Sequence, residues 1–128
     1  MTSGVLIDTS VWVAHFRQRS DDLVELLSLD LTLGHPMVVT ELACGTPPAP
    51  RTRTLDDIAS LPQARQASLV ELREFIEREQ LYGLGCGLVD LALLASVLLT
   101  PGSRLWTHDR RLTQLAERFG VAYMPVQH

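Results

Sequence analysis

Four acidic residues stand in apolar surroundings, unlike the acids of the polar helix faces: Asp8, Glu41, Asp90 and Asp109. Asp8 and Asp109 come at or just after the end of an apolar run, whereas Glu41 and Asp90 lie inside apolar segments. Neither Glu41 nor Asp90 has a basic residue three or four positions away. Burying an ionised carboxylate costs several kcal/mol unless it is paired or binds a metal ion. These carboxylates are therefore the first candidates for a chemical role.

The four carboxylates are expected to form one site. Asp8 and Asp109 follow predicted strands, and open parallel sheets bind ligands beyond the carboxyl ends of their strands. Glu41 and Asp90 lie near the starts of helices, which reach the same edge. Carboxylates gathered there repel one another, and a divalent cation relieves that repulsion. Oxygen ligands without an organised set of His or Cys favour Mg²⁺ or Mn²⁺ over Zn²⁺.

An acidic Mg²⁺ site indicates phosphodiester hydrolysis, because the ion lowers the pKa of a bound water and neutralises charge in the transition state. The small hydroxyls of Ser10 and Thr107 are placed to orient water or a carboxylate. Helix capping is the competing interpretation for Asp8, Ser10 and Asp90, each of which lies near a predicted helix start. Glu41 lies beyond the first helical turn, where capping explains an acid less well.

The basic residues narrow the chemistry further. The chain has 128 residues and a formal net charge of −4, and all 11 of its basic residues are Arg. The absence of Lys excludes a Walker-type phosphate loop, a Schiff-base enzyme and a protein kinase. Without the four site carboxylates, acids and arginines are equal in number, so the acidic total is compatible with a nuclease. The His residues, at 15, 35, 108 and 128, show no paired metal-ligand spacing.

Alternating strands and helices must position these side chains. Short apolar runs predict strands over residues 4–8, 31–33, 104–107 and 121–124. Periodic apolar residues and capping signals predict helices starting near residues 9 and 20, then over 37–44, 51–61, 68–81 and 88–99, with a last helix ending at residue 119. The pattern predicts a single domain over residues 1–128, an α/β sandwich with a mostly parallel sheet.

The cysteines and the apolar segments indicate the compartment. Cys44 and Cys86 form no Cys-x-x-Cys motif, and we expect two buried reduced thiols in a cytosolic protein, with a disulfide between them left open. The apolar run at residues 5–7 has no positive region before it, which does not fit a signal peptide. The longest apolar stretch, 88–99, is too short for a membrane span and contains Asp90. We therefore expect a cytoplasmic protein without a membrane segment.

Four segments in this order and spacing resemble the four motifs of PIN-domain ribonucleases, most closely the VapC toxins of bacterial toxin–antitoxin pairs: residues 5–12, 41–45, 85–95 and 105–112. The resemblance spans residues 5–123. His35-Pro36 and the tryptophan of Leu105-Trp106-Thr107 are typical of one VapC subgroup. One departure is Leu88-Val89, where an aromatic residue is common beside Asp90. That departure concerns the shape of the groove rather than the chemistry.

The resemblance implies a PIN-like three-layer α/β/α sandwich with a central, mostly parallel sheet of about four short strands. It implies Asp8, Glu41, Asp90 and Asp109 as catalytic Mg²⁺ or Mn²⁺ ligands, with Ser10 and Thr107 supporting them. It also implies a homodimer and a VapB-like antitoxin that inserts a chain, often with a basic side chain, into the acidic pocket. The implied substrate is structured RNA such as tRNA or rRNA.

Several arginines near the acidic motifs are candidate contacts to RNA phosphates. The main candidates are Arg17 and Arg19, shortly after Asp8, and Arg110 and Arg111, directly after Asp109. Further candidates are Arg51, Arg53, Arg104 and Arg118. Two alternatives to an endoribonuclease toxin remain at this point. One is a PIN-like nuclease of RNA processing or repair without an antitoxin, and the other is a non-catalytic module whose acids bind a partner's arginine.

Overall fold

The computed structural model of the protein describes residues 3–125. Within that range the chain forms three strands and seven helices. The strands are β1 (Gly4–Ile7), β2 (Thr32–Leu33) and β3 (Ser103–Trp106). The helices are α1 (Thr9–Arg17), α2 (Asp21–Ser28), α3 (Pro36–Ala43), α4 (Arg51–Ala59), α5 (Leu69–Glu79), α6 (Leu88–Leu99) and α7 (Arg110–Arg118).

The three strands form one parallel sheet in the order β2-β1-β3. All four residues of the central strand β1 are buried, as expected for a parallel strand covered on both faces. Ile7 of β1 pairs with Trp106 of β3 at their carboxyl ends. The residues that follow, Asp8 and Thr107, therefore leave the sheet side by side at one edge.

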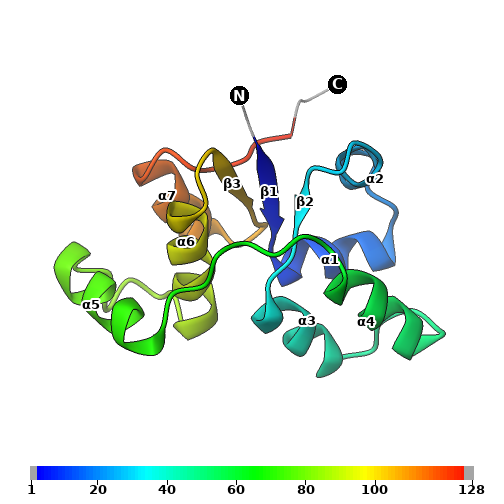
Figure 1. Ribbon diagram of the computed structural model, residues 1–128, viewed down its shortest axis with the longest axis horizontal. Coiled ribbons are helices and arrows are strands. Elements are labelled where there is room, and N and C mark those ends of the chain that lie inside the picture. Colours follow the sequence, from blue (N-terminus) through cyan, green and yellow to red (C-terminus); the bar gives the residue numbers. More distant parts are fainter. Residues whose placement is uncertain (1–2, 126–128) are drawn as a thin grey trace.

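Helices flank the sheet on both sides. In Figure 1, α5, α6 and α7 lie on the side of β3, and α1 to α4 lie on the side of β2. Helix α6 packs against β3, α5 and α7, and α3 packs against α1 and α4. Residues 91–97 of α6 are all buried, which explains why this helix is apolar on nearly every side. The predicted bounds of this helix, 88–99, are confirmed.

The last expected strand, over residues 121–124, is reduced to a single parallel bridge between Leu105 and Ala122. Leu105 donates to the carbonyl of Val121 over 2.7 Å and accepts from Tyr123 over 2.8 Å. Pro125 follows and has no N–H to extend the pairing. The predicted α/β class with a parallel sheet is confirmed, with three strands in the described residues and the Leu105–Ala122 bridge in place of the fourth.

Side-chain caps define where several helices begin. The Ser20 hydroxyl accepts from the Leu23 amide over 3.2 Å at the start of α2. Ser68 and Glu71 form a reciprocal capping box at the start of α5, and the hydrogen bonds from Ser68 lower the pKa of Glu71. These capping signals are readable in the sequence, so the helix starts fall within a residue or two of the predicted positions.

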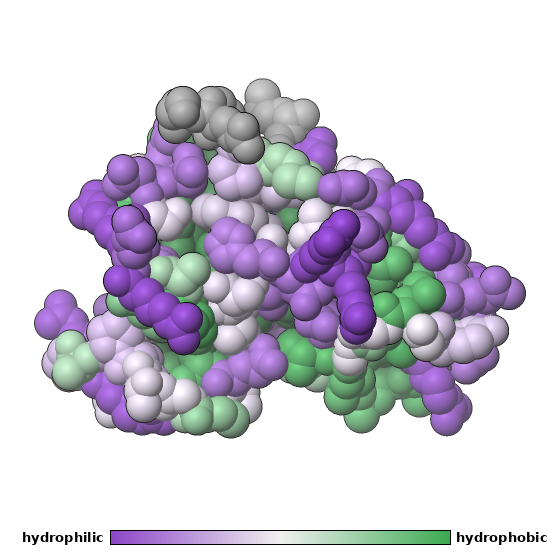
Figure 2. Space-filling model, turned by 180° about the vertical axis from the view of Figure 1, so that it is seen from behind, coloured by the Kyte–Doolittle hydropathy of each residue, from purple (hydrophilic) through white to green (hydrophobic). Residues whose placement is uncertain are grey.

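The surface is mixed in polarity. Figure 2 shows hydrophilic side chains over much of one face, with apolar surface concentrated on the side where α5 lies. Leu69 and Val70 at the start of α5 and Leu98 and Leu99 at the end of α6 are exposed. Among residues 3–125 there is no helix with the length and apolar character that crossing a membrane demands.

Candidate active site

Asp8 is the most buried of the four predicted acids, with 5% of its surface exposed. Its Oδ2 accepts hydrogen bonds from the Ser10 hydroxyl over 2.6 Å and from the Thr107 hydroxyl over 2.8 Å. Asp8 occupies the N-cap position of α1 but makes no side-chain cap bond. Capping therefore does not explain this carboxylate.

The two hydroxyls are themselves fixed by the backbone that follows β3. The amide of His108 donates to Ser10 Oγ over 3.0 Å, and the amide of Asp109 donates to Thr107 Oγ1 over 3.0 Å. Because each hydroxyl accepts from an amide, its own proton is free to point at Asp8. Ser10 thus serves the carboxylate network rather than capping α1, contrary to the competing interpretation.

The other oxygen of Asp8 faces solvent. No hydrogen bond from residues 3–125 ends on Oδ1. Every buried side-chain oxygen or nitrogen in that range has a partner, so an unpartnered Oδ1 must reach solvent. One oxygen of Asp8 is therefore anchored and the other is available to a ligand.

Glu41 is held by a residue that the sequence did not single out. Thr9, the first residue of α1, donates its hydroxyl to Glu41 Oε1 over 2.6 Å. The contact joins α1 to α3 and brings Glu41 to the helix start that follows Asp8. In the sequence, the only indication of this contact is that a hydroxyl residue, Thr9, directly follows the strand-end acid Asp8.

Asp90 lies in the first turn of α6 and is half-buried. Burial raises its pKa, the Gly87 amide hydrogen bond (3.3 Å) lowers it, and the negative charges of Asp8, Asp109 and Glu41 raise it further. The capping interpretation is thus partly right, since Asp90 accepts an amide at the helix start. The charges of all three other acids act on its titration, so the four predicted carboxylates lie in one region of the fold.

Asp109 is exposed and caps α7. Its Oδ1 accepts from the Leu112 amide over 2.8 Å. One of its oxygens is therefore committed to the helix start. Glu41 is also exposed, which corrects the expectation that it is buried in an apolar helix. The burial argument holds for Asp8 and, in part, for Asp90.

The donor set fits a hard divalent cation, because the acids offer carboxylate oxygens and one oxygen of Asp8 is open to solvent. Their side chains do not yet form a closed cage. Within residues 3–125, no three His, Cys, Asp or Glu side chains come close enough together to hold one ion. Binding an ion between them would require the carboxylates to draw together.

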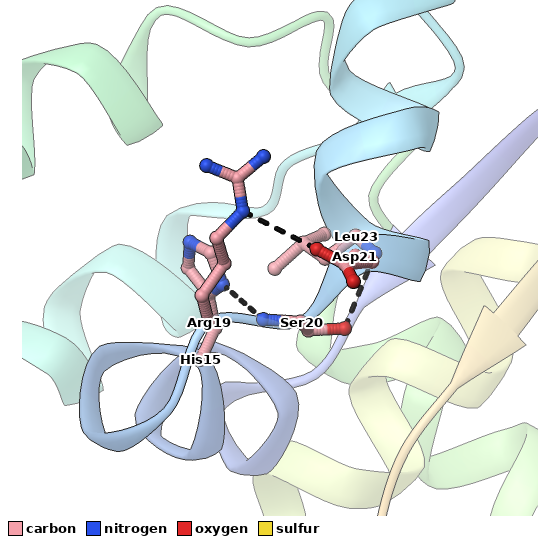
Figure 3. Close-up of polar contacts among 5 residues, drawn as sticks. All are labelled: His15, Arg19, Ser20, Asp21 and Leu23. Atoms are coloured by element: carbon pink, nitrogen blue, oxygen red, sulfur yellow. Dashed lines mark hydrogen bonds and ion pairs between the residues drawn. The ribbon is translucent and has the colours of Figure 1, made fainter.

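The predicted RNA-binding arginines differ in their surroundings. Arg19 pairs with Asp21 over 3.3 Å on the surface, next to His15, whose Nδ1 accepts from the Ser20 amide over 3.0 Å (Figure 3). An exposed pair of this kind contributes little to stability and leaves the guanidinium accessible. Arg17 is exposed and lines a cavity that also contains Glu41.

The arginines after β3 also lie near the acids. Arg110 is exposed at the start of α7. Arg111 packs over Gly85, where a Cβ would come within 2.3 Å of its Nη1. Gly85 has φ +86, a left-handed conformation that favours glycine, whereas the flexible Arg111 side chain could move aside.

Three further arginines donate to backbone carbonyls. Arg51 donates to Ala43 and to Gly45, Arg104 donates to Ala122, and Arg118 donates to Glu79. Their guanidinium groups therefore have structural partners within the protein. Arg53 is exposed on α4.

Both cysteines are free thiols, as expected, but neither is buried. Cys44 is exposed at the end of α3, which corrects that part of the prediction, and Cys86 is half-buried. Burial and the charges of Asp90 and Asp109 raise the pKa of the Cys86 thiol, while Arg111 lowers it. The thiol therefore marks the edge of the acidic cluster.

His35 has a structural role. His35 is buried, its Nδ1 accepts from the Met37 amide over 3.1 Å, and its Nε2 contacts Ser96 Oγ over 3.1 Å. His108 is exposed and packs edge-on against Trp106. His128 lies outside the described residues.

Fold and site together define a PIN-like domain, a small parallel α/β unit with acidic side chains gathered at the carboxyl edge of its sheet. No family model matches the sequence, and no solved structure gives a significant match. Two curated relatives do match, both named Ribonuclease VapC32, from Mycobacterium tuberculosis strains CDC 1551 / Oshkosh and ATCC 25618 / H37Rv. Each is 43% identical over 118 residues, which cover 92% of this chain and 94% of the relative. The chain belongs to the VapC family of PIN-domain ribonuclease toxins.

Proposed function

We propose that this protein cleaves structured RNA, such as tRNA or rRNA, as a Mg²⁺- or Mn²⁺-dependent endoribonuclease. The observation that carries the proposal is the hydrogen-bond network that anchors Asp8 through one oxygen and leaves the other open, in a region where the charges of Asp8, Glu41 and Asp109 raise the pKa of Asp90. The ribonuclease name of the VapC32 relatives supports the choice of RNA as substrate.

Asp8, Asp90, Glu41 and Asp109 would together hold the cation. When bound, the ion supplies an activated water and neutralises charge on the phosphate. Ser10 and Thr107 orient Asp8, and Thr9 orients Glu41, each through one oxygen of the carboxylate. Asp109 would contribute the oxygen that its cap bond leaves free.

Arginines at the margin of the acidic cluster would hold the RNA backbone. Arg17 lies on the α1 side, and Arg110 and Arg111 lie on the α7 side. Arg19 would exchange its exposed partner Asp21 for a phosphate at small cost. Phosphate contacts from both sides would place the scissile bond over the carboxylates.

The proposal is tested by Asp8→Asn and Asp90→Asn, which keep side-chain shape but remove a negative charge. Each is expected to lower Mg²⁺-dependent RNA cleavage by about a hundredfold or more, because a metal contributes several kcal/mol to the transition state. Asp57→Asn, an exposed acid on α4, is the matched control and should cleave as the parent does. Circular dichroism checks the fold of each variant. Parent-like cleavage by both site variants would contradict the proposal.

We further propose that residues 1–128 act as one domain, that the protein works in the cytoplasm as a homodimer, and that a VapB-like antitoxin neutralises it. Membership of the VapC family supports the proposal of an antitoxin partner. Co-expression with the product of the adjacent upstream gene should abolish cleavage and give a complex that elutes together on size-exclusion chromatography. Sequencing of RNA ends after induced expression would identify the substrate.

A further inference from the structure

A cavity of about 500 Å³ opens beside Glu41, between α1, α3 and the Pro-rich loop that follows α3. Its apolar lining includes Val13 and Phe16 of α1, Leu42 of α3 and Pro47 of the loop. The volume falls within the range of about 300 to 1,000 Å³ typical of small-ligand pockets. We refer to it below as the Glu41 pocket.

The lining of the Glu41 pocket contains one negatively charged residue, Glu41, and one positively charged residue, Arg17. Glu41 is fixed by Thr9 and belongs to the proposed cation site. Arg17 is exposed and makes no ion pair with any residue of the described range. The pocket therefore combines a carboxylate, apolar surface and an unpaired guanidinium within one cavity.

We propose that the Glu41 pocket receives one unstacked nucleobase of the RNA, next to the phosphate that is cut. The inference rests on the proposed ribonuclease function. Along an RNA strand, phosphates alternate with bases, and single-stranded loops are recognised by splaying bases onto aromatic or apolar side chains. A phosphate at the acidic end would meet the cation, the next phosphate would meet Arg17, and the base between them would enter the apolar lining.

The charge of the pocket favours RNA over a protein segment as its occupant. A protein chain that neutralises the acidic site with a basic side chain would bring a positive charge toward Arg17. An RNA strand brings negative charge to Arg17, and a cation at the carboxylates offsets the repulsion at the other end. Phe16 adds a ring face, because its side chain is only partly buried.

Gly45 allows the pocket to be filled without strain. A Cβ added there would meet only the Leu42 carbonyl oxygen, at 3.7 Å, which is an ordinary contact, and its backbone is not in the left-handed region. Gly45→Leu is therefore the test variant. Ala59→Leu, which adds a leucine at an exposed position at the end of α4, is the matched control.

Binding is measured with short single-stranded RNAs that carry 2-aminopurine at one position each, in EDTA, which prevents cleavage and leaves the repulsion from the carboxylates equal in parent and variant. When the RNA binds the parent protein, the fluorescence of 2-aminopurine at one position is expected to be quenched. Gly45→Leu should remove this quenching and weaken RNA binding by about tenfold, as loss of one stacked base does. Ala59→Leu should match the parent. In cleavage assays with Mn²⁺, an abasic nucleotide at the quenched position should lower the cleavage rate of the parent protein by about tenfold. The same nucleotide should not lower the cleavage rate of Gly45→Leu any further.

Two outcomes would overturn the inference. The first is that Gly45→Leu binds and cleaves RNA as the parent does. The second is that it loses only the binding of a co-expressed protein partner. Thr46→Phe fills the same pocket from an exposed loop position and replaces Gly45→Leu if the latter does not fold. Failure of the parent to cleave any RNA would contradict the proposed function, whereas the binding measurement in EDTA tests the pocket independently.

Discussion

At the scale of single residues, hydroxyl groups organise the acidic cluster. Three hydroxyls, from Thr9, Ser10 and Thr107, donate to two carboxylates over 2.6 to 2.8 Å. No arginine or lysine performs this task within the described residues, where the ion pairs are Arg19–Asp21 and Arg78–Glu79. Neutral donors orient a carboxylate without cancelling its charge, so the charge stays available to a cation.

Thr107→Val removes the hydroxyl while keeping the shape of the side chain. We expect RNA cleavage to fall about ten- to hundredfold and half-maximal cleavage to need more Mn²⁺, because Asp8 loses one of its two orienting donors. Thr107→Ser restores the hydroxyl and should restore the metal requirement. Titrating Mn²⁺ in cleavage assays measures both. An unchanged metal requirement in Thr107→Val would show that this hydrogen bond does not position Asp8.

At the scale of elements, one histidine joins the two helices that carry Glu41 and Asp90. His35 caps α3, which bears Glu41, and contacts Ser96 of α6, which bears Asp90. Nδ1 accepts from an amide, so the ring is neutral and carries its proton on Nε2. Burial lowers the pKa of His35, because a charged ring would lose both solvation and the cap bond.

This arrangement predicts acid sensitivity. The unfolded chain takes up a proton on His35 below about pH 6.5, whereas the folded protein resists protonation, so the free energy of unfolding should fall as pH drops below that value. His35→Asn keeps a capping oxygen without a titrating group. Urea unfolding of both proteins between pH 7.5 and pH 5, roughly across the ordinary His pKa, should show a shallower decline for His35→Asn. Parallel declines would assign the effect to other groups, such as His15, whose pKa burial also lowers.

At the scale of the whole molecule, the acids are a source of repulsion that a cation would relieve. Asp8, Asp90 and Asp109 arise from three different elements of the fold. Each negative charge near Asp90 raises its pKa, which means that the folded state holds these charges together at a cost. A ligand that binds only the folded state stabilises it by mass action.

Mg²⁺ or Mn²⁺ should therefore raise the thermal unfolding midpoint of the protein. At a concentration one hundred times the dissociation constant, the expected stabilisation is about 2.7 kcal/mol. Asp8→Asn and Asp90→Asn should lose most of this increase, whereas Asp57→Asn should keep it. Differential scanning calorimetry with and without the ion measures the effect. A midpoint that does not respond to either ion would argue against a cation site in the folded protein.

Much of this architecture was predictable because its signals are local. The buried run of β1, the bounds of α6 and the strand-end positions of Asp8 and Asp109 follow from apolar runs and their interruptions. The α/β class follows from the alternation of predicted strands with predicted helices.

Other features depended on contacts between distant segments. The Thr9–Glu41 bond depends on how closely α1 approaches α3, across 32 residues of sequence. The exposure of Glu41 was predicted wrongly because α3 is apolar in composition, yet Pro36, Thr40 and Cys44 form one exposed face beside it. The expected last strand failed because its short apolar run gives no sign of how far it pairs with β3.

The hydrogen bond from Thr107 to Asp8 spans 99 residues of sequence, and the order of synthesis gives that span a consequence. A growing chain contains Asp8 long before it contains the groups that anchor this network, Thr107 and the amides of His108 and Asp109. The hydrogen bonds around Asp8 therefore cannot be completed until the chain has reached residue 109. For a ribonuclease toxin, this order delays the anchoring of Asp8 until β3 and the residues after it have been synthesised.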